Sequence, residues 1–546
     1  MLGLMQQHRL TTAALIDHAA RAHGRTEIVS RQFDGTIVRS SWGELAARAR
    51  QVAAMLAELG AKPGDRIATL AWNRLPHLEL YYGVTAAGMV LHTVNPRLFA
   101  EQIRYIVDHG GARILCVDPD LLPVVEPVIA DLAGIDHVVV LCAQAGIPET
   151  SIPSPIAYED MVAAMRGLPG WPDIDEDSAS SLCYTSGTTG HPKGVLYSHR
   201  STVLHAFAAC AADSMALSAR DSVLLVTPLF HVNAWGLPFT AAMCGAKLVL
   251  PGSALDGESI YSLLRDERIT FSLGVPTLWF SILDHIQRHV SPADRAALSL
   301  QRVFMGGAAT PRTLIERFRD LLGIQANQAW GMTETSPVAT VCKPLSFQAD
   351  YRDDALTDVL ACQGRAVFGI ELRIEDEDGE ALPHDGERSG LLKVRGPWVL
   401  NAYYGSEPGS ALDDDGWLDT GDVANIDRNG FVHLTDRAKD VIKSGGEWIS
   451  SIDLENAATA HPAVAEAAVV GVAHPRWQER PLLLVRLHPG ESVSKKEMDE
   501  HLVAHVARWW LPDAMVVVDD LPHTATGKLL KAALRAHYRD YLTDAV

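Results

Sequence analysis

The sequence predicts an α/β protein with a large N-terminal domain of layered α/β subdomains, including a β-rich subdomain, hinged to a small α+β C-terminal domain. Short apolar runs alternate with amphipathic helical patterns over the first 305 residues, an order that predicts substantially parallel sheets. After about residue 365, apolar and polar residues alternate between Asp/Gly turns, as in antiparallel strands. The length of 546 residues exceeds the roughly 250–300 residues at which a single core stops growing, so more than one domain is expected.

The elements of the N-terminal layers follow from these runs. Strands are expected at residues 66–70, 112–117, 137–141, 222–226, 247–250, 269–273 and 302–305, and helices at 42–59 and 259–268, where apolar residues recur at helical spacing. The stretch from Ser222 to Ala246 carries no Asp, Glu, Lys or Arg, but Pro228, Gly236 and Pro238 interrupt it. It therefore predicts a buried strand, loop and helix rather than a membrane-spanning helix of about 20 apolar residues.

The C-terminal part is expected to contain two smaller units. Alternating strands at 370–374 and 391–395 belong to a β-rich subdomain over about 365–436, which completes a large domain over residues 1–436. Apolar runs at 467–472 and 481–487, with an amphipathic helix from Lys495, predict a separate small domain over 437–546. The junction between the two domains is expected near residues 436–440.

The composition excludes several classes of protein. With 67 acidic against 47 basic residues the formal net charge is -20, which disfavours binding to the phosphate backbone of nucleic acid. A content of 47% hydrophobic and 21% charged residues is typical of globular rather than disordered chains. The seven cysteines are scattered without CxxC or Cys/His ligand spacing, so we expect reduced thiols, no disulfide and no zinc. The first residues lack the pattern of a secretory signal, so a cytoplasmic protein without stable membrane insertion is expected.

The run from Tyr184 to Gly194 predicts a phosphate-binding loop. It compresses four hydroxyl residues, three glycines and one lysine between apolar segments. Glycine lets backbone N–H groups approach an anion, the hydroxyls donate further hydrogen bonds, and lysine adds positive charge. The candidate ligands are Thr185, Ser186, Gly187, Thr188, Thr189, Gly190 and Lys193. The run lacks the spacing of a Walker A loop, which disfavours the P-loop GTPases and ATPases.

This run resembles the signature loop of the adenylate-forming superfamily of acyl-CoA synthetases, peptide-synthetase adenylation domains and luciferases. Four further runs resemble family motifs in the same order, at residues 328–334, 416–422, 436–447 and 522–528. The resemblance covers essentially the whole chain and implies a hinged pair of domains. Runs at 95–99, 198–205, 230–236 and 443–450 are similar to bacterial medium-chain fatty-acid CoA ligases of the alkane-utilisation type and to 3-methylmercaptopropionate CoA ligases.

The resemblance implies an ATP or AMP site. The hydroxyl of Thr333 would donate to the α-phosphate, and the carboxylate of Glu334 would hold Mg²⁺, which prefers hard oxygen ligands. Trp330 would cover the adenine, while Asp422 and Arg437 would bind the ribose. The remaining nucleotide contacts are expected from Gly307, Ala308, Ala329, Gly331 and Met332.

The C-terminal domain would supply the mobile parts of the catalytic machinery. Lys528 follows Thr526 and Gly527, and it resembles the family lysine whose charge offsets the repulsion between a carboxylate and the α-phosphate. Lys439 aligns with the hinge residue, about which the small domain would rotate between two half-reactions. That rotation would present a coenzyme A channel lined by Lys443, Ser444, Gly445, Gly446, Glu447 and Trp448.

The acyl pocket is expected around residues 228–236. His231 would gate or orient the substrate carboxylate rather than act as a base, because a carboxylate is already ionised at neutral pH. A satisfied core histidine is the alternative. Further pocket residues are Val232, Trp235, Trp279, Gly306 and Met332.

The predicted activity is that of an ATP- and Mg²⁺-dependent carboxylic acid:CoA ligase for medium-chain fatty acids, forming acyl-CoA through an acyl-adenylate. The alternatives are a 3-methylmercaptopropionate or other short-acid ligase, transfer to a separate carrier protein, and a nucleotide-binding regulator without catalysis. Retention of Lys193, Glu334, Asp422, Arg437 and Lys528 disfavours the regulator. The partners expected are the acid, ATP and CoA, and the resemblance allows a homodimer.

Overall fold

The computed structural model describes residues 1, 3–185, 191–308, 310–444, 447–523 and 529–543. The large N-terminal part contains two mostly parallel sheets. The seven-stranded sheet has the order β7-β6-β5-β3-β4-β8-β9, and only its β8–β9 pair is antiparallel. Its strands are β3 (Arg66–Leu70), β4 (Val90–Thr93), β5 (Ala112–Val117), β6 (His137–Val140), β7 (Ile156–Ala157), β8 (Ala179–Tyr184) and β9 (Gly194–Ser198).

The nine-stranded sheet has the order β16-β15-β14-β13-β12-β10-β11-β1-β2, with a parallel centre and antiparallel edges. Its strands are β1 (Glu27–Arg31), β2 (Ile37–Ser41), β10 (Ser222–Leu224), β11 (Lys247–Leu250), β12 (Phe271–Gly274), β13 (Arg302–Met305), β14 (Gln325–Gly331), β15 (Val338–Val341) and β16 (Arg365–Ala366). All seven strands predicted in the first 305 residues are confirmed, although the 222–226 run ends as a strand at Leu224.

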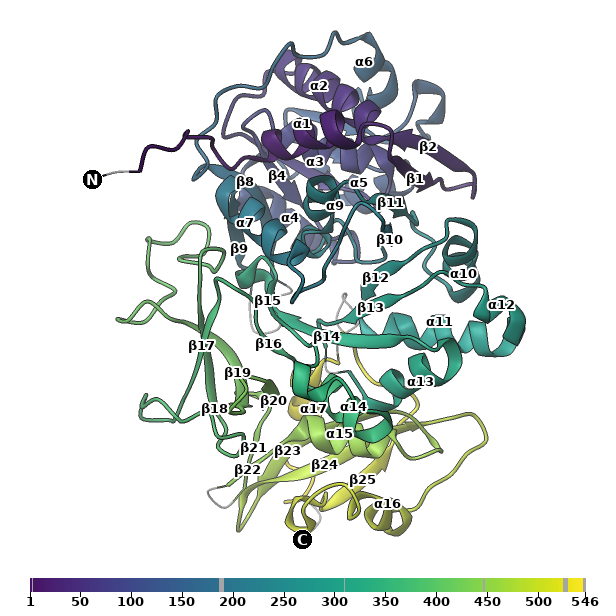
Figure 1. Cartoon of the computed structure of the whole chain (residues 1–546), viewed down its shortest axis with the longest axis vertical. Coiled ribbons are helices and arrows are strands. Elements are labelled where there is room, and N and C mark those ends of the chain that lie inside the picture. Colours follow the sequence, from purple (N-terminus) through teal and green to yellow (C-terminus); the bar gives the residue numbers. More distant parts are fainter. Residues whose placement is uncertain (2, 186–190, 309, 445–446, 524–528, 544–546) are drawn as a thin grey trace.

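Helices cover both faces of each sheet and produce an alternation of helical and sheet layers (Figure 1). The layer between the sheets holds α1 (Thr12–His23), α2 (Trp42–Glu58), α3 (Leu75–Thr85), α6 (Tyr158–Ala164), α7 (His199–Cys210), α8 (Val232–Trp235) and α9 (Leu237–Cys244). The outer face of the seven-stranded sheet is covered by α4 (Ala100–Gly110) and α5 (Leu122–Ile129). The outer side of the other sheet carries α10 (Gly257–Asp266), α11 (Pro276–His289), α12 (Pro292–Ala296), α13 (Arg312–Leu322) and α14 (Asp353–Leu360).

A four-stranded antiparallel sheet follows, in the order β17 (Glu371–Glu375), β18 (Gly390–Arg395), β19 (Leu418–Ile426) and β20 (Val432–Arg437). The alternating pattern predicted this sheet because one of its faces packs on the main core while the other carries polar side chains. A turn over residues 438–441 then leads into the last sheet.

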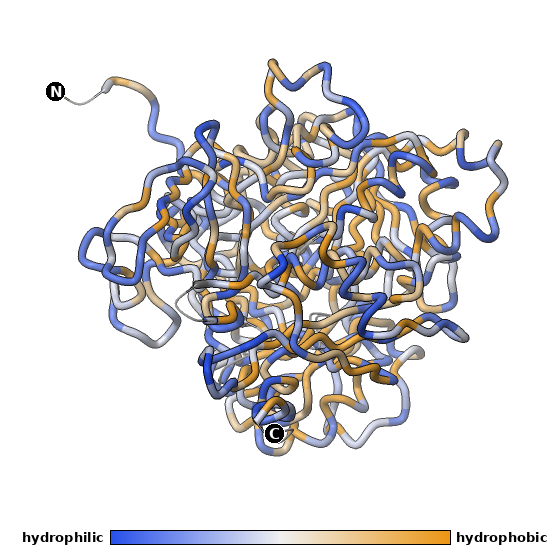
Figure 2. Tube along the Cα trace, turned by 90° about the horizontal axis from the view of Figure 1, so that it is seen from below, coloured by the Kyte–Doolittle hydropathy of each residue, from blue (hydrophilic) through white to orange (hydrophobic). Residues whose placement is uncertain are grey.

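The C-terminal elements form a fourth, five-stranded sheet below the large part (Figure 1). They are β21 (Ile442–Ser444), β22 (Glu447–Ile449), α15 (Ser451–Thr459), β23 (Val464–His474), β24 (Gln478–Leu487), α16 (Lys495–Leu502), β25 (Ala514–Val517) and α17 (Lys531–Tyr538). The side chains of β23 and β24 that face α15 and α16 form one apolar cluster, and those that face α17 form another. Several loops at the rim of the molecule are hydrophilic (Figure 2).

The uncharged stretch 222–246 folds as β10, a loop, α8 and α9, as predicted from its prolines and glycines. In the part of the chain that the structure describes, no helix combines the length and the apolar composition needed to cross a membrane.

Candidate active site

A cavity of about 2020 Å³ lies where the large N-terminal part faces the C-terminal elements. Pockets for one small molecule usually measure about 300–1,000 Å³, so this cavity has room for more than one substrate. The predicted site residues that line it are Thr185, Lys193, His231, Val232, Trp235, Gly306, Gly307, Ala308, Ala329, Trp330, Gly331, Met332, Thr333, Glu334, Asp422, Arg437 and Lys439. Motifs that are more than 200 residues apart in the sequence therefore meet at one cavity.

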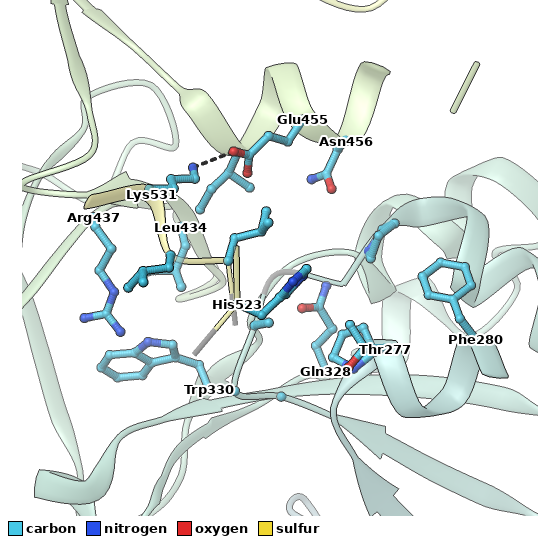
Figure 3. A pocket seen from close by; sticks show the side chains of 18 of the residues that line it. Thr277, Phe280, Gln328, Trp330, Leu434, Arg437, Glu455, Asn456, His523 and Lys531 are labelled. Atoms are coloured by element: carbon cyan, nitrogen blue, oxygen red, sulfur yellow. Dashed lines mark ion pairs between the residues drawn. The ribbon is translucent and has the colours of Figure 1, made fainter. Parts of the chain in front are cut away.

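One end of the cavity carries an indole, a carboxylate and a guanidinium in contact. Asp422 and Arg437 are opposite each other on β19 and β20, and the Arg437 Nε atom lies 2.9 Å from Asp422 Oδ1. The Trp330 Nε1–H group donates to Asp422 Oδ2 over 3.0 Å from the end of β14. Figure 3 shows the Arg437 side chain beside the Trp330 ring. The arrangement presents a flat aromatic surface beside a buried, charged hydrogen-bond acceptor.

Thr333 and Glu334 follow β14 in a short 3₁₀ turn, Thr333–Thr335. The β14–β15 pairing shifts register between Trp330 and Gly331, and a Cβ atom on Gly331 would lie 1.8 Å from the carbonyl oxygen of Pro337, so only glycine fits. The hydroxyl of Tyr197 donates to the Thr333 carbonyl over 2.7 Å, and the hydroxyl of Tyr403 donates to Glu334 Oε1 over 2.8 Å. The Glu334 carboxylate thus lines the cavity with one oxygen held by a tyrosine.

The predicted phosphate loop joins β8 to β9, which form an antiparallel pair that ends at Tyr184 and Gly194. The Thr185 N–H group donates to the Lys193 carbonyl over 2.9 Å, and the Lys193 N–H group donates to Thr185 Oγ1 over 3.2 Å. The Lys193 ammonium lies 4.6 Å from the centre of the Tyr403 ring. The predicted ligands Ser186, Gly187, Thr188, Thr189 and Gly190 lie outside the described residues.

The apolar end of the cavity is shaped by a left-handed turn that the sequence did not predict. Val232, Asn233, Ala234 and Trp235 have φ values of 48°, 50°, 49° and 56°. This conformation costs roughly 1–2 kcal/mol per L-residue. Buried hydrogen bonds oppose that cost, because Asn233 Nδ2 donates to Ser181 Oγ over 2.8 Å and Asn233 Oδ1 accepts from Tyr81 Oη over 3.3 Å. The turn places the Trp235 ring against Gly306, where an added Cβ would lie 3.2 Å from the indole.

The prediction that Trp279 helps to set the depth of the pocket is wrong. Its side chain is fully buried and packs edge-on against Phe318, with ring centres 5.3 Å apart, in the core behind the nine-stranded sheet. It is not among the described residues that line the cavity. An apolar residue on α11 has the same sequence pattern whether it faces the core or a ligand, and here the core-facing position applies. Val232, Trp235 and Met332 do line the cavity.

The C-terminal elements contribute the opposite wall, through His523, residues 529–532 and α15 (Figure 3). The predicted catalytic Lys528 lies outside the described residues. Lys439 lies in the turn between β20 and β21, its carbonyl accepts a hydrogen bond from Arg535 Nη1, and burial lowers the pKa of its ammonium.

Sequence reasoning missed a buried charged cluster at this junction. Lys531 Nζ lies 2.7 Å from Glu455 Oε1 and donates to Ser451 Oγ over 2.6 Å, and the Ser451 N–H group donates to Asp436 Oδ2 over 2.7 Å. Burial raises the pKa of Glu455 to about 7, whereas the neighbouring carboxylates of Glu455 and Asp436 raise the pKa of Lys531 against the effect of burial. The only signal in the sequence was Asp436, which opens the predicted hinge motif.

Three of the residues predicted for coenzyme A lie away from the cavity. Lys443, Ser444 and Trp448 are not among the described residues that line the cavity. Lys443 Nζ lies 2.7 Å from Glu377 Oε1, and its ammonium lies 5.7 Å from the Trp448 ring. Gly445 and Gly446 and the side chain of Glu447 lie outside what the structure describes.

No group of three or more His, Cys, Asp or Glu side chains among the described residues has the geometry of a metal site. Each of the seven cysteines is a free thiol. Glu334 presents one carboxylate to the cavity from the Thr333–Thr335 turn, so it fits an ion that takes its other ligands from phosphate oxygens and water, the usual arrangement for Mg²⁺.

Comparison with known proteins gives matches over nearly the whole chain. Residues 15–404 match the model of the AMP-binding enzyme family, and residues 453–528 match that of the AMP-binding enzyme C-terminal domain. A medium-chain-fatty-acid–CoA ligase of Ectopseudomonas oleovorans is 47% identical over 542 residues, covering 99% of this chain and 98% of that protein. A 3-methylmercaptopropionyl-CoA ligase of Ruegeria lacuscaerulensis is 48% identical over 543 residues, covering both chains completely.

A solved structure of the anthranilate CoA ligase AuaEII in complex with anthranoyl-AMP has the same fold. It superimposes with a TM-score of 0.85 at 24% identity and covers 99% of both chains.

Proposed function

The chain belongs to the AMP-binding enzyme family, and from that premise we propose that it is an ATP-dependent carboxylic acid:CoA ligase that works through an acyl-adenylate. The observation that carries the proposal is the meeting, at one cavity, of the indole–carboxylate–guanidinium group, the Thr333–Glu334 turn, Lys193 and the apolar wall formed by the 232–235 turn. A nucleotide and an acid can lie there side by side. Relatives named as CoA ligases at 47% and 48% identity support the same activity.

The first half-reaction needs the acid carboxylate in line with the α-phosphate. Trp330 would cover the adenine face, and Asp422 would accept hydrogen bonds from the ribose hydroxyls, since its two oxygens are already oriented by Trp330 and Arg437. Lys193, Thr185 and the loop between them would bind the β- and γ-phosphates, and Thr333 would donate to the α-phosphate. Gly307, Ala308, Ala329, Gly331 and Met332 would supply the remaining nucleotide contacts. A carboxylate oxygen then attacks the α-phosphorus, the bond to the bridging oxygen breaks, and pyrophosphate leaves.

Charge repulsion between the carboxylate and the phosphate is the main obstacle to this step. Lys528 would lie between the two anions and stabilise the transition state electrostatically. Its neighbours in the chain, His523 and Leu529, line the cavity, which supports this role. A bound Mg²⁺, held by Glu334, would neutralise part of the phosphate charge.

The second half-reaction transfers the acyl group to coenzyme A. The thiol sulfur attacks the acyl carbon, the mixed anhydride bond breaks, AMP leaves, and the thiol proton passes to solvent. Because Lys443, Ser444 and Trp448 lie away from the cavity in this arrangement, their proposed role requires the small domain, residues 437–546, to rotate about Lys439. Gly445, Gly446 and Glu447 would then line the thiol channel together with them.

The apolar wall favours an unbranched aliphatic acid. His231, at the start of the left-handed turn, would orient the carboxylate. Val232, Trp235 and Gly306 would enclose the acyl chain, and the Trp235 ring, which lies against Gly306, would limit the depth of the pocket. Medium-chain fatty acids fit this description, and 3-methylmercaptopropionate is a second candidate because an equally similar relative is named for it. Cytoplasmic location and a homodimer stay predictions.

The proposed mechanism is tested by replacing Lys528 with Ala. Acid-dependent exchange of labelled pyrophosphate into ATP should fall at least 1000-fold, the scale lost when a transition-state cation is removed. Binding of ATP, measured by calorimetry, should change less than threefold. Exchange that persists in the variant would contradict the role of Lys528.

A further inference from the structure

Tyr403 contacts two residues of the proposed phosphate end, although no motif in the sequence pointed to it. Its hydroxyl donates to Glu334 Oε1 over 2.8 Å. Its ring lies 4.6 Å from the Lys193 ammonium. One side chain therefore acts on both the carboxylate proposed to bind the metal and the cation proposed to bind phosphate.

The backbone around Tyr403 is hydrogen-bonded both to the Thr333–Glu334 motif and to the end of the predicted phosphate loop. Tyr403 lies in the irregular segment between β18 and β19. The Leu400 N–H group donates to the Glu334 carbonyl over 2.7 Å, and the Tyr404 N–H group donates to the Gly194 carbonyl over 2.8 Å. A Cβ atom on Gly194 would approach the Tyr404 side chain to 3.0 Å, so glycine permits this close contact. Tyr403 thus lies between two anchor points, one at each motif.

The hydroxyl acts as the donor in this contact. A phenol carries its proton at neutral pH, and an ionised carboxylate can only accept a hydrogen bond, so the Tyr403 hydroxyl donates to Glu334. A hydroxyl that donates to one oxygen of the Glu334 carboxylate restricts the rotation of that carboxylate. Loss of a hydrogen bond to a metal-binding side chain commonly weakens metal affinity 10- to 100-fold. The ring attracts the exposed Lys193 ammonium through its negative face, which holds this cation near the cavity.

We propose that Tyr403 is a positioning residue for the metal and phosphates of ATP, acting through its hydroxyl on Glu334 and through its ring on Lys193. The proposal rests on the proposed function, since it assumes that ATP and Mg²⁺ bind in this cavity. The roles of the hydroxyl and of the ring can be tested separately, because phenylalanine keeps the ring without the hydroxyl and leucine has neither.

The test measures ATP binding by isothermal titration calorimetry at a series of Mg²⁺ concentrations, without acid or CoA. Tyr403→Phe should raise the Mg²⁺ concentration for half-maximal enhancement of ATP binding about tenfold. Its metal-free ATP affinity should be unchanged. Tyr403→Leu should show the same change with Mg²⁺ and, in addition, about threefold weaker metal-free binding, the scale of an exposed cation–π contact.

Two further variants separate positioning from general damage. Tyr351→Phe removes a hydroxyl from a tyrosine that lies outside the cavity and should match the wild type. In a Glu334→Gln background, Tyr403→Phe should have no further effect on the Mg²⁺ dependence, because its hydroxyl acts through that carboxylate. An unchanged Mg²⁺ dependence in Tyr403→Phe, or an equal effect with and without Glu334, would overturn the proposal. Wild-type protein that binds no ATP would instead overturn the proposed function.

Discussion

Replacing Asp422 with Ala tests the ribose site most sharply. The carboxylate is buried, one oxygen faces Trp330 and the other faces Arg437, and both line the cavity. Hydrogen bonds to a charged acceptor contribute about 1.5–3 kcal/mol each, so losing two ribose hydroxyl contacts costs at least about 3 kcal/mol. At about 1.4 kcal/mol per factor of ten, the affinity for ATP should fall about 100-fold.

The assay compares ATP with 2′,3′-dideoxy-ATP by calorimetry. In the wild type, removal of both hydroxyls should weaken binding by about the same 100-fold. In Asp422→Ala the two nucleotides should bind within about threefold of each other, because the partner of the hydroxyls is gone. Arg437 is 42% exposed at its side chain and can be hydrated, so the variant should fold.

A variant that still prefers ATP over the dideoxy nucleotide by the wild-type factor would refute the assignment. Equal weakening of both nucleotides would mean that Asp422 acts only by holding Trp330 and Arg437 in place.

Three further changes test the packing that supports the site. Lys531→Met leaves the buried carboxylate of Glu455 without its partner, so the free energy of unfolding, measured in urea, should fall by about 3 kcal/mol. Burial lowers the pKa of His92 to about 3, so the folded state binds fewer protons than the unfolded chain. The free energy of unfolding should therefore fall as the pH drops below about 6.5, the ordinary pKa of histidine. In the same assay, His92→Leu should reduce the fall in this free energy between pH 7.5 and 5 by about 2 kcal/mol. Gly331→Ala would place a Cβ 1.8 Å from the Pro337 carbonyl oxygen and should reduce pyrophosphate exchange at least 100-fold, and near-wild-type exchange would refute that constraint.

The parts of the site that could be predicted are those whose chemistry lies within a few consecutive residues. Thr333 and Glu334, like Thr185 and Lys193, are carried by short motifs, and the cavity wall includes all four. The strands of the parallel sheets could be predicted equally well, because a strand that is buried on both faces is a short apolar run in the sequence. Burial on both faces therefore produces a local sequence pattern that predicts the strand without knowledge of distant residues.

The parts that could not be predicted depend on contacts between distant segments. The left-handed turn at Val232 opposes the local preference of a β-branched residue, and Asn233 stabilises it through Ser181, which lies 52 residues away. In the sequence, Tyr403 is an aromatic residue in a loop, and its role depends on a hydroxyl contact with Glu334, which lies far away in the chain. Trp279 shows the converse, since its pattern fitted a pocket but its ring packs in the core.

The central claim is that this chain joins a carboxylic acid to CoA at the expense of ATP. The most direct test is AMP release by the purified protein with ATP and Mg²⁺, across acids from propionate to palmitate with 3-methylmercaptopropionate and benzoate included, each with and without CoA. The proposed function predicts CoA-dependent AMP release with a maximum at one aliphatic acid of intermediate length, and an equimolar amount of its acyl-CoA. AMP release with no acyl-CoA would contradict the proposed acceptor and favour a carrier protein, whereas no release with any acid would contradict the proposed ligase.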